Sequence, residues 1–223
     1  MKKNILLIGS DSGIAKNLIR NIIDNGDNLF TASRRDKCEF KSFKHFQIDL
    51  SILEDIKKFN KEISKYFFDS LIFLPGIFSI KSINEENEMS IFNDLMVNLT
   101  APMLITVPVI KNMLLKNNGT LIYIGSSSSY AGFKNTSVYC SSKHGLLGFC
   151  RALADETREK NIRTTLISPG SINTKMASPL IQGNNFESFI DPNEVSDLIF
   201  ELIYNQSKSM WQEEIILKRR SYS

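Results

Sequence analysis

A tyrosine and a lysine stand four residues apart in the middle of the chain, as Tyr139 and Lys143. On a helix, this spacing places the two side chains one turn apart on the same face. A nearby ammonium favours phenolate over phenol, so we expect Lys143 to lower the pKa of Tyr139 below its reference value of about 10. A tyrosine tuned in this way can exchange a proton with an alkoxide near neutral pH. Because the spacing is common by chance and on its own favours a solvated helix face, the rest of the chain must decide.

Composition and charge are those of an ordinary globular protein. The 223 residues, 42% of them hydrophobic, suit one domain, and a net charge of +3 with scattered lysines argues against nucleic acid as a partner. The apolar run at 5–8 is too short for a signal peptide and no other stretch approaches a membrane span, so we expect a cytoplasmic protein without membrane contact. We expect no metal site and no disulfide, because His45 has no second ligand in view and Cys38, Cys140 and Cys150 lack metal-ligand spacing.

Strand and helix patterns alternate along the chain. Unbroken apolar runs predict strands near 4–8, 29–32, 45–48, 70–74, 120–124, 162–167 and 214–217. Helical spacing predicts helices near 14–23, 52–67, 87–115, 139–159 and 191–204, the third kinked or broken at Pro102 and Pro108. This alternation predicts an α/β fold, a single doubly wound Rossmann-type domain over 1–223, with a parallel sheet of about seven strands and helices on both faces. In such folds ligands bind beyond the carboxyl ends of the strands.

A glycine-containing turn follows the first predicted strand. Glycine lets the backbone approach a pyrophosphate, whose charge is held by the amides and dipole at the start of the next helix. A plain strand–helix turn would also use glycine, but the position in a βαβ unit favours phosphate binding. We therefore expect a dinucleotide to contact the six residues of this turn, Gly9, Ser10, Asp11, Ser12, Gly13 and Ile14.

The second predicted strand ends in Ser33, Arg34 and Arg35, where the ribose of a dinucleotide would lie. An enzyme that selects NAD usually offers a carboxylate here to the 2′-hydroxyl, whereas arginine accommodates a 2′-phosphate. The first acid, Asp36, comes only after both arginines. Although a solvated charged loop would have a similar composition, the glycine turn favours NADP(H) as cofactor, with NAD(H) as the less favoured alternative.

Together with the glycine turn, Tyr139 and Lys143 resemble the classical branch of the short-chain dehydrogenase/reductase family over nearly the whole chain. The family's T-G-x-x-x-G-x-G motif matches residues 8–15, with isoleucine for the threonine and alanine for the third glycine. Its N-N-A-G element falls on residues 73–76, Phe-Leu-Pro-Gly, where only Gly76 is kept. That is the clearest departure from the family pattern.

The resemblance assigns roles to individual residues. It implies that Ser126, thirteen residues before Tyr139, hydrogen-bonds the substrate oxygen while Tyr139 supplies or accepts the proton. It implies that Lys143 lowers the pKa of that tyrosine and binds the nicotinamide ribose. Asn98, at a break in its helix, would hold a water that links Lys143 to solvent. Further cofactor contacts are implied for Asp49, Leu50, Gly76, Pro169, Gly170, Ile172 and Thr174.

The implied reaction is hydride transfer between nicotinamide and a small carbonyl or alcohol substrate. A short substrate loop at about 175–190 suits a carrier-bound acyl group, as in 3-oxoacyl-carrier-protein reductases. It equally suits a dehydrogenase substrate of sugar or surface-polysaccharide metabolism. A dinucleotide-binding sensor or scaffold without activity is a third interpretation, although a pure binder has no need of Ser126 together with Tyr139.

A homodimer or homotetramer is also implied by the resemblance. In the family, the helices that correspond to 87–115 and 137–159 pack against another subunit. The apolar residues Leu146, Leu147, Phe149 and Cys150 agree with such a contact, because a solvated helix would need fewer of them.

Overall fold

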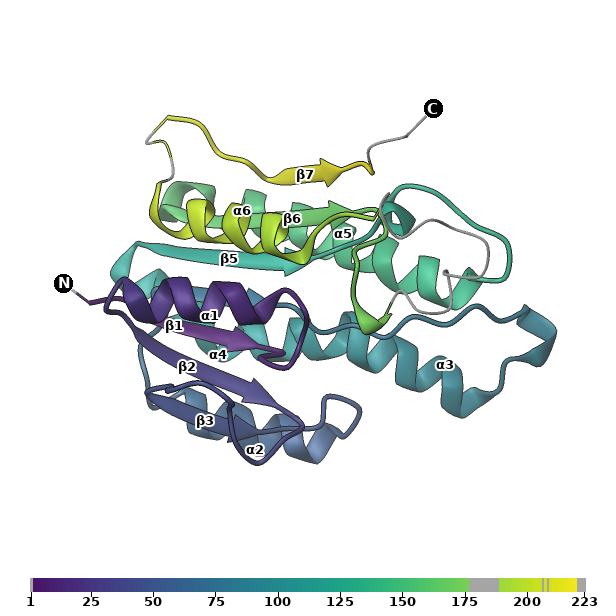
Figure 1. The fold of residues 1–223 in the computed structure, drawn as a ribbon, viewed down its shortest axis with the longest axis horizontal. Helices are drawn as coiled ribbons and strands as arrows, with labels where there is room; N and C mark the ends of the chain where they lie inside the picture. The colour runs from purple at the N-terminus through teal and green to yellow at the C-terminus, as the bar shows by residue number, and fades with distance from the viewer. Residues whose placement is uncertain (1, 177–188, 206, 208, 220–223) are drawn as a thin grey trace.

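Seven strands form one parallel sheet in the computed structural model, which describes residues 2–176, 189–205, 207 and 209–219 (Figure 1). The strands are β1 (Asn4–Ile8), β2 (Asn28–Ser33), β3 (Lys44–Gln47), β4 (Ser70–Phe73), β5 (Gly119–Ile124), β6 (Ile162–Pro169) and β7 (Glu214–Leu217). Their order, β3-β2-β1-β4-β5-β6-β7, confirms the predicted doubly wound sheet. From β1 the following strands are added toward one edge of the sheet, up to β3, and from β4 they are added toward the other edge, up to β7. Doubly wound folds bind ligands at this switch point between β1 and β4.

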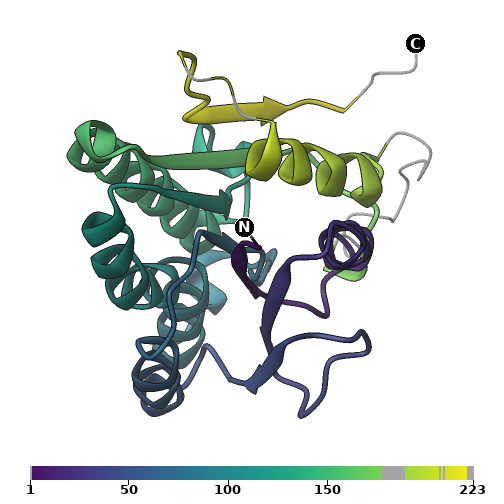
Figure 2. The same ribbon diagram turned by 90° about the vertical axis from the view of Figure 1, so that its left-hand side faces the viewer.

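Helices cover both faces of the sheet (Figure 2). One face carries α1 (Ala15–Asp24) and α6 (Pro192–Tyr204), and the other carries α2 (Leu53–Ile63), α4 (Ala101–Lys116) and α5 (Ser137–Thr157). Successive strand residues point to opposite faces, so Ile5 and Leu7 enter the core under α1 while Leu6 and Ile8 enter the core under α4. Two buried faces explain why the strands read as unbroken apolar runs.

The second helix is shorter than its sequence pattern predicts, because α2 ends at Ile63 and not near residue 67. The chain leaves the helix there, and the rings of Tyr66 and Phe68 pack against Phe30 of β2 with centroids 5.0 and 5.1 Å away. The apolar residues that extended the helical pattern thus serve an aromatic cluster at the edge of the core.

The predicted helix over 87–115 is helical throughout and contains one irregular turn. It consists of α3 (Glu88–Leu95), a π-helical turn (Met96–Thr100) and α4. The predicted break therefore falls just before Pro102, whereas Pro108 lies inside α4 without ending it. π-helical turns are rare and often occur at functional sites. This one carries Asn98, which is buried.

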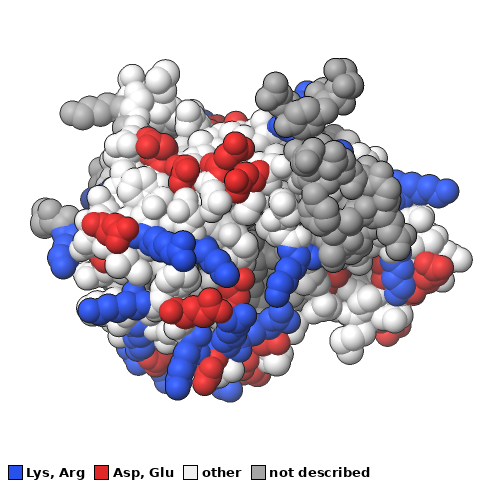
Figure 3. Space-filling view, in the orientation of Figure 1, with Lys and Arg blue, Asp and Glu red and all other residues white. Residues whose placement is uncertain are grey.

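The sequence predicted no segment as long as a membrane span, but the stretch Glu88–Lys116 reaches that length. Its 29 residues are long enough and apolar enough to cross a membrane. One side, with Ile105, Val109 and Met113, is packed into the core against the sheet, as in a core helix of a globular domain. Over the face shown in Figure 3, side chains of both charge signs are interspersed.

The apolar residues of α5 that the sequence suggested for a subunit contact belong to the chain's own core, and Phe149 is half-buried against it. Leu146, Leu147 and Cys150 are buried in the chain's own core, so their apolar character needs no partner. Exposed apolar side chains lie instead along α3 and α4, where Met89, Phe92, Met103, Val107 and Leu114 recur at helical spacing.

Candidate active site

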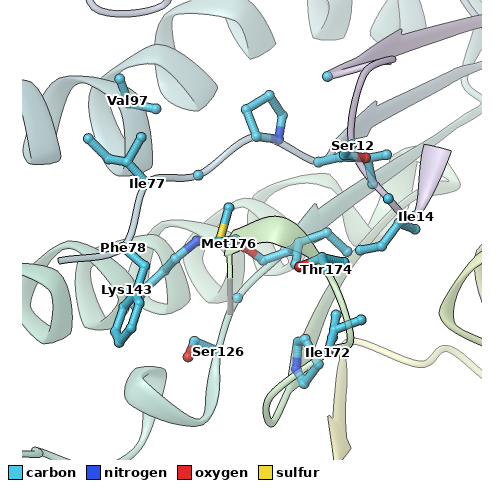
Figure 4. A pocket seen from close by; sticks show the side chains of 18 of the residues that line it. Ser12, Ile14, Ile77, Phe78, Val97, Ser126, Lys143, Ile172, Thr174 and Met176 are labelled. Carbon is cyan, nitrogen blue, oxygen red and sulfur yellow. Dashed lines mark hydrogen bonds between the residues drawn. The ribbon is translucent and has the colours of Figure 1, made fainter. Parts of the chain in front are cut away.

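A cleft of about 1510 Å³ runs along the carboxyl ends of the strands. Figure 4 shows Ser12 and Ile14 at one end and Lys143, Phe78 and Ser126 at the other. Pockets for single small ligands usually measure about 300–1,000 Å³, so this cleft has room for an elongated ligand. Every residue predicted from the sequence to contact cofactor or substrate lines the cleft, except Asn98, which is buried behind it.

The glycine turn after β1 keeps its backbone close to other segments of the cleft. Gly9 has a φ of +85°, and a Cβ there would lie 2.9 Å from Cγ of Pro75. A Cβ on Gly13 would lie 2.8 Å from Cγ2 of Thr174. Ser10 is buried, and its Oγ has no hydrogen-bond partner among the described residues. Helix α1 starts at Ala15, so the turn lies at a helix N-terminus. Glycines without side chains and a buried hydroxyl without a partner among the described residues fit a pyrophosphate at this position.

The predicted ribose end carries both arginines. Arg35 is paired with Asp11, its Nε 3.4 Å from Oδ2, and with Glu39. Arg34 makes no ion pair within 4 Å among the described residues. Asp49 accepts hydrogen bonds from the hydroxyl and backbone amide of Ser51, at 2.6 and 2.9 Å. These bonds, aided by the charge of Arg34, hold the pKa of the Asp49 carboxyl below its usual value.

A short turn after β5 sets the position of Ser126. The Ser126 Oγ accepts a hydrogen bond from the amide of Ser128 at 3.1 Å, and its own amide donates to Oγ of Ser129 at 3.1 Å. This reciprocal pair fixes the serine at the start of the turn. Ser126 is also the serine of this run whose side chain lowers the pKa of Tyr139, so the two side chains lie close together.

Tyr139 and Lys143 lie in the first turns of α5, which turns them toward the cleft. Both are buried, at 7% and 3% exposure. The Lys143 Nζ donates to the carbonyl oxygen of Ile124 at 3.0 Å and lies 5.8 Å from the centre of the Tyr139 ring. A Cβ on Gly76 would be 3.4 Å from that Nζ, so glycine at this position leaves the ammonium its space.

The expected direction of the Tyr139 pKa is wrong. Burial raises the pKa of Tyr139 above 10, and the side chain of Ser126 only partly opposes it. Burial also lowers the pKa of Lys143 to about 8. The physical reason is that both groups have lost water, while the ammonium is turned toward a backbone carbonyl and not toward the phenol. At neutral pH Tyr139 therefore carries its proton.

Asn98 acts on the segment after β4. Its side-chain Oδ1 accepts from the amide of Ile77 at 2.9 Å, and its Nδ2 donates to the carbonyl of Ile77 at 3.0 Å and to Oγ of Ser142 at 3.2 Å. The amide side chain thus braces the segment that replaces the family's N-N-A-G element, and ties it to α5. The predicted water link to Lys143 stays a prediction.

Phe78 is a site residue that the sequence reasoning missed. Its ring stands edge-on to Tyr139, with centroids 4.8 Å apart and an interplanar angle of 76°. Its neighbour Ser79 donates a hydrogen bond to Asp94 of α3 at 3.0 Å, which anchors the segment a second time. A single sequence carries little signal for this contact, because nothing in the spacing relates residue 78 to residue 139.

Most of the predicted substrate loop, residues 177–188, lies outside the described part of the chain. Of its flanks, Met176 lies across the cleft near Lys143 in Figure 4. Ile190 pairs with Ile172 as an isolated parallel bridge, which holds the returning chain beside the segment after β6.

Comparisons with known proteins show which family the chain resembles. Residues 3–185 match the family model described as short chain dehydrogenase. The chain is 30% identical over 188 residues to 3-oxoacyl-[acyl-carrier-protein] reductase FabG of Buchnera aphidicola, covering 80% of this chain and 77% of that protein. It is 26% identical over 216 residues to Carbonyl reductase family member 4 of Xenopus laevis, covering 91% and 92%.

Solved structures show the same fold. The putative NAD(P) dependent gluconate 5-dehydrogenase of Beutenbergia cavernae, with bound NADP, superposes with a TM-score of 0.88 at 20% identity, covering 97% of this chain and 95% of the other. A 4-hydroxyisoleucine dehydrogenase complexed with NADH superposes with a TM-score of 0.84 at 25% identity, covering 97% of both chains.

A doubly wound parallel sheet with serine, tyrosine and lysine at its carboxyl edge, beside a glycine turn, defines an oxidoreductase that works with a nicotinamide dinucleotide. The chain belongs to the short-chain dehydrogenase/reductase family.

Proposed function

We propose that this protein is an NADP-dependent reductase of a small carbonyl substrate, of the kind that acts on 3-oxoacyl groups attached to a carrier. The observation that carries the proposal is that Tyr139 is buried beside Ser126, that burial raises its pKa, and that Lys143 lies behind it. A phenol that holds its proton at neutral pH is a proton donor, and donation to a developing alkoxide is what carbonyl reduction requires.

Each residue of the site has a separate task in this reaction. When bound, the cofactor supplies the hydride that adds to the carbonyl carbon. Ser126 holds the carbonyl oxygen by a hydrogen bond, and Tyr139 gives its proton to that oxygen as the carbon–oxygen double bond becomes a single bond. Lys143 then stabilises the phenolate left behind, and solvent returns the proton. In the oxidative direction the same groups would act in reverse order.

The preference for NADP rests on the segment after β2. Arg34 and Arg35 line the cleft at this end, where a 2′-phosphate would meet the guanidinium of Arg34, which has no ion pair among the described residues. A carboxylate placed to take both ribose hydroxyls, as NAD-selective enzymes use, is not among the described residues at the end of β2 itself. This charge pattern favours the phosphorylated dinucleotide.

The substrate end of the cleft is basic. Four exposed cations from three segments line it: Lys134, Lys175, Lys218 and Arg219. The carboxylates that line the cleft, Asp11, Glu39 and Asp49, lie at the cofactor's adenosine end. This separation favours a substrate with an anionic group or an acidic carrier, and 3-oxoacyl-carrier-protein reductases are among the relatives.

Sugar and surface-polysaccharide substrates remain the second candidate, because the cleft is open and gluconate dehydrogenase is a structural neighbour. A sensor without activity is disfavoured, since a pure binder has no need of serine, tyrosine and lysine together in the cleft. For the assembly, the proposal is a homodimer formed along the exposed apolar side chains of α3 and α4.

The test combines cofactor titration with a substrate panel. NADPH and NADH are titrated by nicotinamide fluorescence, and loss of absorbance is then followed with 3-oxoacyl thioesters, simple ketones and sugar-derived ketones. We expect tighter binding of NADPH and the highest kcat/KM with a 3-oxoacyl thioester. A highest kcat/KM with sugar-derived ketones would replace the proposal by the second candidate, and tight binding without any turnover would overturn both.

A further inference from the structure

His45 of β3 holds the backbone of the arginine segment. In the parallel β2–β3 pairing His45 lies directly opposite Thr31. Its Nδ1 is 2.8 Å from Oγ1 of Thr31, and its Nε2 is 3.0 Å from the carbonyl oxygen of Arg35. The ring therefore connects a fully buried hydroxyl on β2 with the loop that leaves the end of that strand.

The chemistry of the two contacts sets the tautomer of the ring. A backbone carbonyl only accepts, so the Nε2 of His45 must carry a hydrogen and donate it to Arg35. In the neutral ring Nδ1 then has no hydrogen and accepts from the hydroxyl of Thr31. The two bonds point the ring in one direction, and Arg35 receives a donor with a fixed position.

Two further side chains on the same face complete this arrangement. Gln47, two residues beyond His45 on β3, donates from Nε2 to the carbonyl of Arg34 at 3.1 Å. Ser33, opposite Gln47 in the register, accepts from the amide of Arg35 at 3.2 Å. Side chains from the paired ends of β2 and β3 thus bind both carbonyls and one amide of the two arginines.

The side chains of the two arginines are unequally engaged. Arg35 is paired with Asp11 and Glu39, whereas Arg34 makes no ion pair within 4 Å in the described part of the chain. The positive charge of Arg34 only helps to lower the pKa of Asp49. Arg34 is therefore the arginine whose guanidinium is available to bind a phosphate. Gln47 and His45 bond the backbone carbonyls of Arg34 and Arg35, and so fix the backbone from which these side chains extend.

We infer that His45 and Gln47 of the edge strand β3 are positioning residues for cofactor selectivity, which hold Arg34 and Arg35 in place for the 2′-phosphate of the adenosine ribose. The inference rests on the proposed preference for NADP. Neither side chain touches the cofactor's reacting end. Their effect is confined to ligands that carry the 2′-phosphate, because only that group needs the guanidinium at a fixed place.

The test uses the whole protein and two fragments of the cofactor, 2′,5′-ADP and 5′-AMP, titrated by calorimetry. For the unaltered protein we expect tighter binding of 2′,5′-ADP. In His45→Ala and in Gln47→Ala we expect the affinity for 2′,5′-ADP to fall about tenfold, the scale of one hydrogen bond to a charged group, with little change for 5′-AMP. His45→Gln should recover most of the loss, because its amide can accept from Thr31 and donate to Arg35.

The matched control is Lys44→Met on the same strand. Lys44 Nζ donates to the hydroxyl of Tyr66 at 3.1 Å, away from the arginine segment. It should leave the ratio of the two affinities unchanged.

The outcomes separate the two proposals. If the unaltered protein binds both fragments equally, the preference for NADP is wrong. If it prefers 2′,5′-ADP and the His45 and Gln47 variants keep the same ratio as the control, this inference is overturned and the preference stands. Equal weakening of both fragments would show a merely structural role and also overturn it. Should His45→Ala not fold, Gln47→Ala at the exposed end of the strand decides.

Discussion

The ring of Phe78 stands edge-on against the buried ring of Tyr139. The centroids are 4.8 Å apart, and Tyr139 is 7% exposed. Phe78 follows directly after Ile77, whose backbone is bonded on both sides by the amide of Asn98. Asn98 of the π-helical turn is thus connected, through Ile77, to the residue that packs against Tyr139.

Phe78→Ala is expected to lower the pKa of Tyr139, because burial is the largest cause of its elevation. The protonated phenol is the active form in reduction, so activity falls as the pH rises through this pKa. A lower pKa therefore moves the alkaline fall of kcat/KM for reduction to lower pH. The control is Phe133→Leu, an exposed aromatic residue of the same cleft. An unshifted profile in Phe78→Ala would contradict the role given to this ring.

Tyr139→Phe is expected to reduce kcat by about 10²–10⁴-fold, the usual contribution of a positioned acid or base. NADPH binding, measured by fluorescence, should stay nearly unchanged, since the ring remains. Tyr130→Phe removes a hydroxyl that donates to Glu214 at 2.7 Å and should keep kcat within a few-fold. Full activity of Tyr139→Phe would refute the assignment of the proton donor.

Gly13→Ala is expected to weaken cofactor binding about tenfold or more, the scale of overpacking a tight contact. The new Cβ would lie 2.8 Å from Cγ2 of Thr174, so the segment after β6 must move. Thr174→Ser removes that methyl group and keeps the hydroxyl, and the double variant should regain most of the affinity. Gly132→Ala, where a Cβ would meet nothing within 4 Å, is the control. Failure of the double variant to recover would show that the clash is not the cause.

Asn98→Ala should lower both stability and kcat. It leaves the backbone groups of Ile77 without their partner and removes the bond that the hydroxyl of Ser142 accepts. We expect a loss of about 2 kcal/mol in the free energy of unfolding, or about 4–8 °C in Tm for a chain of this size. Asn112→Ala, which removes one bond to the carbonyl of Tyr66, should cost less stability and leave kcat unchanged. Equal effects of both variants on kcat would argue against a specific role of Asn98.

Val107→Glu is expected to dissociate the proposed dimer, because it places a charge in the middle of the exposed apolar side of α4. Sedimentation or light scattering would show the change from dimer to monomer. Met210→Glu, at an exposed apolar residue outside these helices, should leave the assembly intact. A monomeric unaltered protein would exclude the proposed dimer directly.

Local chemistry and periodicity were enough to predict the order of strands and helices and the segments that line the cleft. The unbroken runs of β1 and β4 imply two buried faces, and parallel strands bring their carboxyl ends to one edge. For this reason the glycine turn at Gly9 was predicted to lie at a ligand site, to which the family resemblance added Ser126 and Thr174.

Only the tertiary structure decided the electrostatics and the bracing of that site. The pKa of Tyr139 is raised mainly by burial, and the ring of Phe78 that packs against it lies 61 positions away in the chain, at a spacing that carries no signal. The same holds for His45, which reads as an ordinary strand residue until the register of β2 and β3 sets it opposite Thr31 and beneath the carbonyl of Arg35. Burial and cross-strand contacts are properties of the packed chain, so a local pattern places a residue at a site without determining its protonation or its partners.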